Sequence, residues 1–351
     1  MKKVVKQVVA FDVAQNELVV TLGRVYDDVS QELVASKTFA NRQGGFKALL
    51  LWIKRFFDAE LQTLYVMEAT GVYHESLAYF LDDQGFWVSI VLPNKISSYM
   101  RTLQVKTITD KTASQAICSF GMDRKLPRWK RPVDTYKKLR QLTRERHQIV
   151  DQRTVALNQM HAQKAQAEPC PSSLQRTKKL IEFLSRQEKQ IIVEITELVK
   201  QGGEVKRAVG LISSITGVGE LTAATVLGET NGFDLIKSKK QLTSYAGLDV
   251  VEKQSGTSVK GKAKISKRGN KYLRRAMHLP ALTAIGHDER FKALFARVVA
   301  KHGIKMKAVV AVQRKLLEMT YTIFKTGMSY DKQYLQKQQN TQAEQIIKAI
   351  N

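Results

Sequence analysis

The sequence predicts an α/β domain at the N-terminus, a helical and basic middle region, and a mainly helical C-terminal region. Strand patterns rich in β-branched residues alternate with amphipathic helix patterns over the first third, whereas helical spacing prevails afterwards. Charge divides the chain at the same place: residues 1–119 hold 13 basic and 12 acidic side chains, and residues 120–351 hold 44 and 20. We therefore expect a catalytic or structural domain in front and a polyanion-binding region behind it.

The first third begins with three short strands over residues 4–13, 17–25 and 32–40, and the turn-compatible residues between them favour an antiparallel meander. The elements that follow are a helix over 46–57, a strand over 64–68, a helix over 73–85, a strand over 87–92 and a helix over 94–103. This order, βββαβαβα, is that of the RNase H-like fold. An element order is a fold-level analogy and says little about chemistry.

Three carboxylates occupy informative positions in this pattern. Asp12 lies within the first strand, Glu68 ends the fourth, and Asp110 begins the helix expected after the fifth. A charged group in an apolar strand is costly unless it is paired or binds a metal. The first and fourth strands are neighbours in an RNase H-like sheet, so Asp12 and Glu68 could share Mg²⁺. Alternatively, Asp12 is hydrogen-bonded to a backbone amide and Asp110, after Thr109, only caps a helix.

Composition excludes several classes of protein. With 43% hydrophobic residues, 351 residues are enough for real cores, and a net charge of +25 favours a nucleic-acid partner over a small neutral substrate. The two cysteines, Cys118 and Cys170, form no Cys-x-x-Cys pair, so neither a disulfide framework nor a zinc site is expected. No apolar run reaches about 18 residues. We expect a cytoplasmic protein that neither spans nor binds a membrane.

The middle region is helical and basic. Residues 124–146 carry ten basic side chains and two acidic ones, with Trp129 among them, a mixture that suits phosphate contact and stacking but also an ordinary solvated face. Apolar residues at 3-4 spacing on both sides of residues 169–171 predict two helices in an antiparallel hairpin or coiled coil. Its seam could form a dimer or an intramolecular core.

The third region begins near residue 205 with a glycine-containing motif. Gly217 and Gly219 stand in Ile-x-Gly-Val-Gly, which predicts a helix-hairpin-helix whose backbone amides contact a phosphate. The alternative is an ordinary turn between helices. The six histidines show no obvious partner in the sequence, and we expect scattered surface residues or residues satisfied by hydrogen bonds, not a base or a set of metal ligands.

A strongly basic segment follows, with nine basic residues and no acid from Lys253 to Arg275. A segment of this composition cannot bury itself, so we expect it to grip nucleic acid, with a disordered linker as the alternative. The residues expected to contact nucleic acid are Gly217, Gly219, Lys260, Lys262, Lys264, Lys267, Arg268, Lys271, Arg274 and Arg275.

Five motifs in order carry a resemblance that extends to about residue 325. They are FDVAQ, MEATGVYH, KTITDKTASQAI, ITGVG and QSGTSVKGKAKISKRGNKYLRRAM. The chain resembles DEDD-type insertion-sequence transposases related to the Piv DNA invertases, which are recombinases guided by a bridge RNA. The resemblance implies a RuvC-like front domain, an oligomerising helical hairpin and a nucleophilic serine in the rear domain.

Carried over residue by residue, the resemblance makes Asp12, Glu68 and Asp110 metal-binding catalytic acids and Ser255 the nucleophile. The fourth acid of the family is replaced by Ala113. Either three carboxylates suffice, or Ser114 or Gln115 helps to hold a water, or this copy is impaired.

The implied protein is a transposase that exchanges DNA strands through a serine-phosphodiester intermediate with Mg²⁺. Its expected partners are DNA, a structured guide RNA and further copies of itself in a dimer or tetramer. The alternatives are a RuvC-like metal-dependent nuclease and a catalytically inactive nucleic-acid-binding protein. The expected domains are a RuvC-like domain over 1–130, a helical hairpin over 131–204, a transposase domain over 205–330 and a Gln-rich tail over 331–351.

Overall fold

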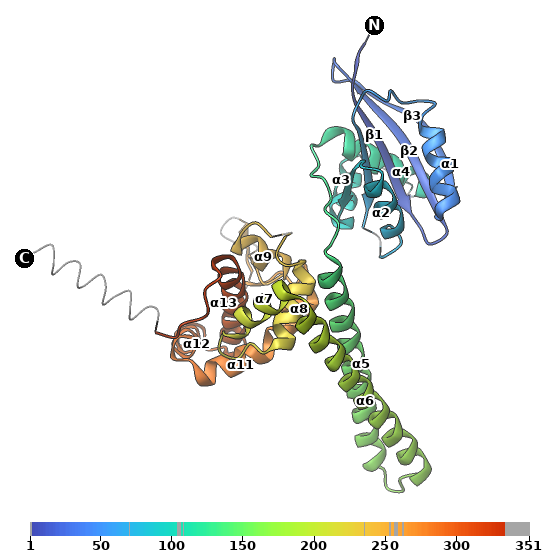
Figure 1. Cartoon of the computed structure of the whole chain (residues 1–351). Coiled ribbons are helices and arrows are strands. Elements are labelled where there is room, and N and C mark those ends of the chain that lie inside the picture. The colour runs from blue at the N-terminus through green and yellow to red at the C-terminus, as the bar shows by residue number, and fades with distance from the viewer. Residues whose placement is uncertain are drawn as a thin grey trace, which may run out of the picture. The chain divides into compact units, whose positions relative to one another are not determined.

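A computed structural model divides the chain into two compact units, Met1–Arg131 and Pro132–Asn351 (Figure 1). The residues that the structure describes are 2–69, 71–103, 107, 109–234, 236–252, 254–255, 259–261 and 263–333. Among them, no helix is both long and apolar enough to cross a bilayer.

The first unit is built on a five-stranded sheet of order β3-β2-β1-β4-β5. Its strands are β1 (Val4–Val13), β2 (Glu17–Tyr26), β3 (Gln31–Ala40), β4 (Thr63–Glu68) and β5 (Trp87–Val91). The first three form an antiparallel meander, and β4 is parallel to both β1 and β5. The predicted meander and the predicted pairing of the first and fourth strands are both confirmed, and this mixed sheet has the strand order of the RNase H-like fold.

Helices cover both faces of this sheet. They are α1 (Gln43–Ile53), α2 (Glu75–Asp83), α3 (Pro93–Thr102) and α4 (Asp110–Asp123). Phe11 and Met67 pack into one core with α1 and α2, whereas Val8 and Val66 pack into a second core with α3 and α4. Successive side chains of a strand alternate between faces, so Asp12 and Glu68 lie on the face that α4 covers. The helix expected over 94–103 is α3, and the helix expected to begin at Asp110 is α4.

Helix α4 lies close to the sheet because of a glycine. A Cβ added at Gly121 would stand 2.8 Å from Val8 Cγ1 and 3.0 Å from Val66 Cγ2, so a side chain there would push the helix away from β1 and β4. Thr109 fixes the start of the helix: its Oγ1 accepts a hydrogen bond from Thr112 N at 3.2 Å, and its N donates to Thr112 Oγ1 at 2.8 Å. This capping box fixes the position of Asp110 in the first turn.

The basic stretch before residue 132 packs against the first unit. Trp129 N donates to Val88 O at 2.7 Å, and the Trp129 ring meets Tyr79 edge-on at 5.5 Å. Arg131 forms an ion pair with Asp83 at 2.6 Å. Trp129 and this arginine are therefore occupied within the unit, which favours a structural role over stacking on a nucleic-acid base.

Two long helices begin the second unit, α5 (Asp134–Lys164) and α6 (Pro171–Gln201), and they pack as an antiparallel hairpin (Figure 1). Glu188 is buried between them, 8% exposed, and forms ion pairs with Arg146, at 2.7 Å, and with Arg153. The polar residues at seam positions therefore pair with one another. The two helices and the break between them agree with the sequence, while a coiled-coil packing stays a prediction.

The rest of the second unit is mainly helical. It contains α7 (Gly203–Ser213), α8 (Glu220–Thr230), α9 (Lys239–Tyr245), α10 (Lys271–Ala276), α11 (His278–His287), α12 (Glu289–His302) and α13 (Lys305–Thr326). Helix α8 is buried along its length from Ala223 to Thr230, and Phe233 and Leu316 share its core. Four two-residue strands lie between α9 and α10.

Candidate functional site: a carboxylate cluster and a serine hairpin

Two of the predicted acids of the first unit, Asp110 and Glu68, act on the third, Asp12. Parallel pairing of Phe11 with Met67 brings the next residues, Asp12 and Glu68, to neighbouring positions at the end of β1 and β4. The pKa of Asp12 is raised to about 6, first by burial and then by the charges of Asp110 and Glu68. The structure therefore gathers carboxylates that lie far apart in the sequence.

The chemistry of this cluster fits Mg²⁺. All three groups offer the oxygen ligands that a hard cation prefers. Burial raises the pKa of Asp12 most, and the charges of Asp110 and Glu68, which raise it further, are ones that a cation would relieve. Among the described residues, no three or more acidic, histidine or cysteine side chains are arranged to hold a metal ion by themselves. Mg²⁺ usually takes one or two carboxylates together with substrate phosphate and water, so the cluster fits an ion that is bound with the substrate.

Ala113, which stands in the place of the fourth acid, and its neighbour Ser114 point in different directions from α4. Ala113 is one helical turn after Asp110 and one turn before Ile117, which packs on the sheet, so Ala113 faces the cluster side of α4. Ser114 is fully buried instead, and its hydroxyl is 2.8 Å from Thr21 Oγ1 on β2. The Ser114 hydroxyl thus already has partners within the unit, among them Lys111 O at 2.9 Å, and its expected part in holding a water stays a prediction.

The backbone of Ser255 belongs to one of two short antiparallel strand pairs, which together are called the serine hairpin. Strand β6 (Val250–Val251) pairs with β9 (Lys264–Ile265), and β7 (Gln254–Ser255) pairs with β8 (Val259–Lys260). Ser255 pairs with Val259, and Gln254 pairs with Lys260. The side chains of Ser255 and Lys260, and the whole of Lys262, lie outside the described residues.

The base of this hairpin is anchored to the second unit. Ser266 N donates to Asp249 O at 2.9 Å, and Ser266 Oγ donates to the Asp249 carboxylate at 2.6 Å. Arg274 Nη1 donates to Ala246 O at 2.8 Å. Among the described basic residues that are expected to contact nucleic acid, the exposed ones are Lys264, Lys267, Arg268, Lys271 and Arg275. The basic segment therefore starts and ends at fixed points rather than as a free linker.

A buried acid that the sequence analysis did not single out supports this base. The Glu229 side chain has no exposed surface, and its two oxygens accept hydrogen bonds from Arg144 Nε at 2.6 Å and Nη2 at 2.7 Å. Asn270 Nδ2 also donates to it, at 2.6 Å. Its position as the single acid at the end of the apolar run LTAATVLGE was the signal available in the sequence.

The two glycines of the predicted helix-hairpin-helix have different surroundings. Gly217 has a φ of +87°, and a Cβ there would lie 2.6 Å from Pro280 O on α11, so this glycine serves close packing. Gly219 is the exposed N-cap of α8 with open space around it. The close packing at Gly217 explains why a glycine stands there, and the expected phosphate contact stays a prediction for both glycines.

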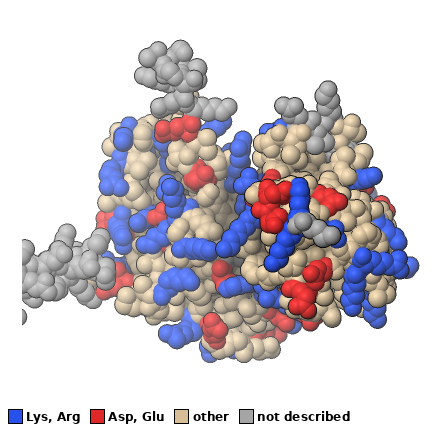
Figure 2. All heavy atoms as spheres, turned by 90° about the horizontal axis from the view of Figure 1, so that it is seen from above, with Lys and Arg blue, Asp and Glu red and all other residues tan. Residues whose placement is uncertain are grey.

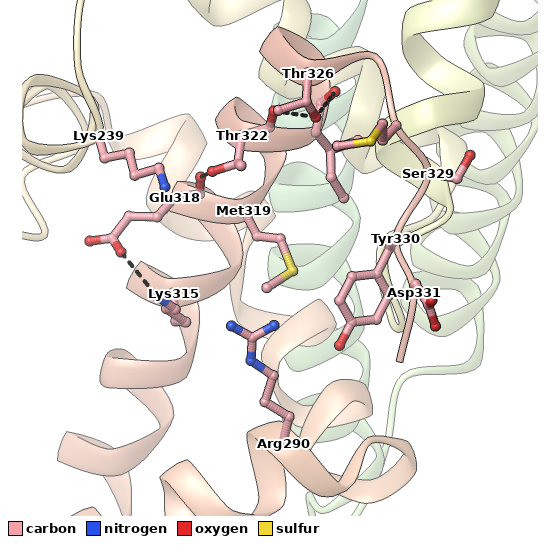
Figure 3. A pocket seen from close by; sticks show the side chains of 12 residues that line it. Lys239, Arg290, Lys315, Glu318, Met319, Thr322, Thr326, Ser329, Tyr330 and Asp331 are labelled. Atoms are coloured by element: carbon pink, nitrogen blue, oxygen red, sulfur yellow. Dashed lines mark hydrogen bonds and ion pairs between the residues drawn. The ribbon is translucent and has the colours of Figure 1, made fainter. Parts of the chain in front are cut away.

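A cavity of about 470 Å³, lined by both charged and apolar side chains, lies beside α12 and α13 (Figure 3). Arg290 and Lys315 face it together with Met319, and Glu318 forms an ion pair with Lys315 at 3.8 Å. Tyr330 closes one side, where its hydroxyl donates to Asp288 Oδ2 at 2.8 Å. The chain after α13 therefore packs back on the unit as far as this tyrosine.

Basic side chains are widely spread over the surface. Figure 2 shows Lys and Arg across the drawn face, with Asp and Glu in smaller groups between them. An RNase H-like sheet with gathered carboxylates, followed by a region of 44 basic and 20 acidic residues, defines a class of enzymes that act on nucleic acids.

Family models narrow this class. The model described as "Transposase IS116/IS110/IS902 family" matches residues 209–296, and a model for the DEDD transposase of IS110 matches residues 9–169. The chain is 30% identical to the pilin gene-inverting protein of Moraxella bovis over 300 residues, which cover 84% of this chain and 90% of that protein. The chain therefore belongs to the IS116/IS110/IS902 family of transposases, and it is a DNA transposase or recombinase, which confirms the resemblance in the sequence.

Further similarities agree with this family. The pilin gene-inverting protein of Moraxella lacunata is 30% identical over 303 residues, with the same coverage. An uncharacterized 43.6 kDa protein of insertion element IS110 from Streptomyces coelicolor is 29% identical over 121 residues, 34% of this chain and 30% of that protein. A structure of T. thermophilus RuvC in complex with a Holliday junction substrate matches 32% of this chain and 90% of its own, with 12% identity and a TM-score of 0.25. The fold assignment rests on the strand order instead.

Proposed function

We propose that this transposase exchanges DNA strands through a covalent bond between Ser255 and a DNA phosphate, assisted by Mg²⁺ at Asp12, Glu68 and Asp110. The observation that carries the proposal is the parallel pairing of β1 with β4, which brings Asp12 and Glu68 to neighbouring positions on an RNase H-like sheet, with Asp110 near enough to help raise the pKa of Asp12. The serine and the carboxylates belong to different units, so the proposal divides the chemistry between a metal-holding unit and a nucleophile-bearing unit.

The covalent step conserves the energy of the phosphodiester. The Ser255 oxygen forms a bond to phosphorus, the bond from phosphorus to the leaving strand's oxygen breaks, and the serine proton ends on that oxygen as a hydroxyl. A hydroxyl of a second strand then reverses the step and releases the serine. No ATP is needed. Residues 256–262 read Gly-x-x-x-x-Gly-Lys, but Ala263 follows where a nucleotide-binding phosphate loop has Ser or Thr.

The carboxylates act by holding the cation. When bound, Mg²⁺ neutralises charge that develops on the phosphate. Asp12 must lose its proton before it can serve as a ligand, and Glu68 and Asp110 complete the negative site. Lys264, Lys267 and Arg268, which are exposed beside the hairpin base, supply further positive charge toward DNA.

We also propose a structured RNA partner, which the family resemblance implies, and self-association through α5 and α6. Exposed apolar side chains on this hairpin, among them Val155, Leu180 and Phe183, support the second proposal. Nuclease digestion and sequencing of nucleic acid that co-purifies with the protein test the first. Light scattering of the purified protein tests the second.

The covalent intermediate provides the direct test. Incubation with labelled DNA of the element ends, followed by denaturing electrophoresis, is expected to give a protein–DNA adduct, which Ser255→Ala abolishes while DNA binding stays nearly intact. Ser258→Ala, in the same segment, is the control and is expected to keep the adduct. Free DNA ends without an adduct would identify a metal-dependent nuclease instead, and binding without cleavage would identify an inactive protein.

A further inference from the structure

A second cavity, of about 580 Å³, opens in the second unit beside the base of the serine hairpin. Residues from α5, β9, α10, α11 and α13 line it. Three of the described lining residues are cationic, Lys271, Arg274 and Arg275, against one acid, Asp151. The cavity therefore has the charge of an anion site and the size of a site for a small molecule.

The two arginines of this cavity have partners within the second unit, and the partner of Arg275 lines the cavity with it. Arg274 Nη1 donates to Ala246 O at 2.8 Å and to Gly269 O at 3.2 Å, and among the described residues no carboxylate pairs with it. Arg275 Nη2 forms an ion pair with Asp151 at 2.6 Å. Side chains fixed by a second set of partners are typical of binding sites, whereas lysines and arginines of a solvated face move freely.

A histidine of the cavity is fixed in the same way. Gln313, 5% exposed, donates from Nε2 to His278 Nδ1 at 2.8 Å, so the proton of the neutral imidazole is on Nε2. His278 therefore keeps an N–H donor on the other side of its ring. The fold brings His278 and His147 to the same cavity, where each ring is hydrogen-bonded.

His147 adds a hydrogen-bond acceptor rather than a charge. Its Nδ1 lies 2.7 Å from Thr143 O, which can only accept, so Nδ1 carries the proton and Nε2 keeps its lone pair. Burial lowers its pKa, and the charges of Arg275 and Arg146 lower it further, so the ring is neutral near pH 7. The cavity wall thus combines cations, a neutral donor and a neutral acceptor.

We propose that this cavity binds one nucleotide of a single nucleic-acid strand, with the phosphate against Lys271, Arg274 and His278. The inference rests on the proposed function, because it takes nucleic acid as the ligand. The cations and the His278 donor match a phosphate, and the remaining volume takes a sugar and a base, whereas a base-paired duplex cannot enter.

The hairpin relates this cavity to Ser255. Ile265 lines the cavity and pairs with Val250, and Ser255 follows Val250 by five residues. A chain of five residues spans at most about 18 Å, so the proposed site holds its strand only a few nucleotides from the serine. The cavity would keep one strand in position while its neighbouring phosphodiester is attacked.

The test measures binding by the full-length protein without added metal. Its probes are single-stranded DNA and RNA 12-mers of the same base sequence, and the corresponding DNA duplex, each carrying a fluorescent label. The variant is Lys271→Ala with His278→Ala, and the control is Lys301→Ala with His302→Ala, an exposed pair on α12. We expect the first pair to weaken single-strand binding about tenfold and to reduce the slope of log affinity against log salt by about 0.7, the value for one phosphate on a single strand.

Duplex binding and the control pair are expected to change less than about twofold, and the 12-mer that loses more affinity identifies the strand as DNA or RNA. An equal loss on the duplex, or no loss on either 12-mer, would overturn the inference. Lys271→Glu alone, at an exposed position that folding tolerates, repeats the test if the double variant unfolds. Ser255→Ala keeps single-strand binding in this assay, so failure of the serine proposal is seen separately.

Discussion

Asn270 donates from its side-chain amide to Glu229 Oε2 at 2.6 Å, and its own Oδ1 accepts hydrogen bonds from Tyr272 N and Leu273 N, the first amides of α10. One asparagine thus caps α10 and connects that helix to α8. Arg144 of α5 binds the same carboxylate. Glu229 therefore joins the long hairpin, the core helix α8 and the return end of the serine hairpin.

Removal of this carboxylate should destabilise the second unit. Glu229→Ala leaves Arg144 without its partner, and we expect a loss of about 2 kcal/mol, less than the ~3–5 kcal/mol for fully buried pairs because the Arg144 side chain is 41% exposed. Thermal unfolding of the full chain measures the loss. Glu289→Ala, whose exposed pair with Lys292 spans 3.2 Å, should cost less than about 0.5 kcal/mol. Equal effects of the two variants would contradict the central role of Glu229.

Asp12 should make the metal-free protein less stable as pH rises. Its pKa in the fold, about 6, lies above the ordinary 3.8, so the fold binds the proton more tightly than the unfolded chain, and stability falls between about pH 4 and pH 6. Asp12→Asn should therefore raise the melting temperature at pH 7.5 and leave it unchanged near pH 4. Asp28→Asn is the control of opposite sign, because Lys2 lowers the pKa of Asp28 to about 2. A lower melting temperature for Asp12→Asn at pH 7.5 would argue against the charge cluster.

Mg²⁺ affinity should depend on the same proton. Below about pH 6 the ion competes with the proton on Asp12, so affinity and strand exchange should rise up to about pH 6 and level off above it. Titration calorimetry in buffers of different ionisation enthalpy measures the released proton. Asp12→Asn and Glu68→Gln should each eliminate activity, since an amide keeps the shape without the charge. Full activity in excess chelator would end the metal proposal.

Ala113→Asp tests whether the missing fourth acid limits the enzyme. Because Ala113 is one turn from Asp110 on the cluster side of α4, a new carboxylate there would join the other three, and we expect tighter Mg²⁺ binding and faster strand exchange. Ala113→Asn has nearly the same shape without charge and should give no gain. If the aspartate also gives none, three carboxylates with water already complete the site.

The basic segment that contains the serine hairpin should account for much of the salt dependence of duplex binding. Each neutralised phosphate contributes roughly −0.9 to the slope of log affinity against log salt. Neutral replacements at all five positions of the segment should flatten that slope by several units, for matched and unmatched DNA alike. The positions are Lys260, Lys262, Lys264, Lys267 and Arg268. An unchanged slope would indicate that the basic residues between Arg124 and Arg146 make the phosphate contacts instead.

The sequence could predict the strands and the acids because both follow from local pattern. The apolar run of β1 predicts a strand that is buried on both faces, and the RNase H-like order makes β4 its neighbour, so Asp12 and Glu68 follow directly. Contacts between distant elements leave no such pattern. Nothing local shows that Ser114 faces Thr21, or that Gly217 packs against Pro280.

The sequence could not predict the cavity beside the serine hairpin, because its lining residues come from elements that lie far apart in the chain. His147 and His278 stand 131 positions apart, on α5 and α11, and Gln313 comes from α13. Each looks like an ordinary helix residue in its own segment. Only the packing of three helices brings them together, and a pattern of period 3.6 carries no information about which helices meet.

The shared carboxylate of Glu188 limits how the long hairpin can change in length. Arg146 and Arg153 are seven residues apart, two turns of α5, and both reach one acid on α6. Each helix has 31 residues and is about 46 Å long at 1.5 Å per residue. A one-turn slide would leave a buried charge unmatched, so the rod has one alignment. Insertions or deletions between these residues and the tip should therefore be tolerated only as matched pairs, one in each helix. The length of the hairpin is thus set by both helices together and cannot change in one of them alone.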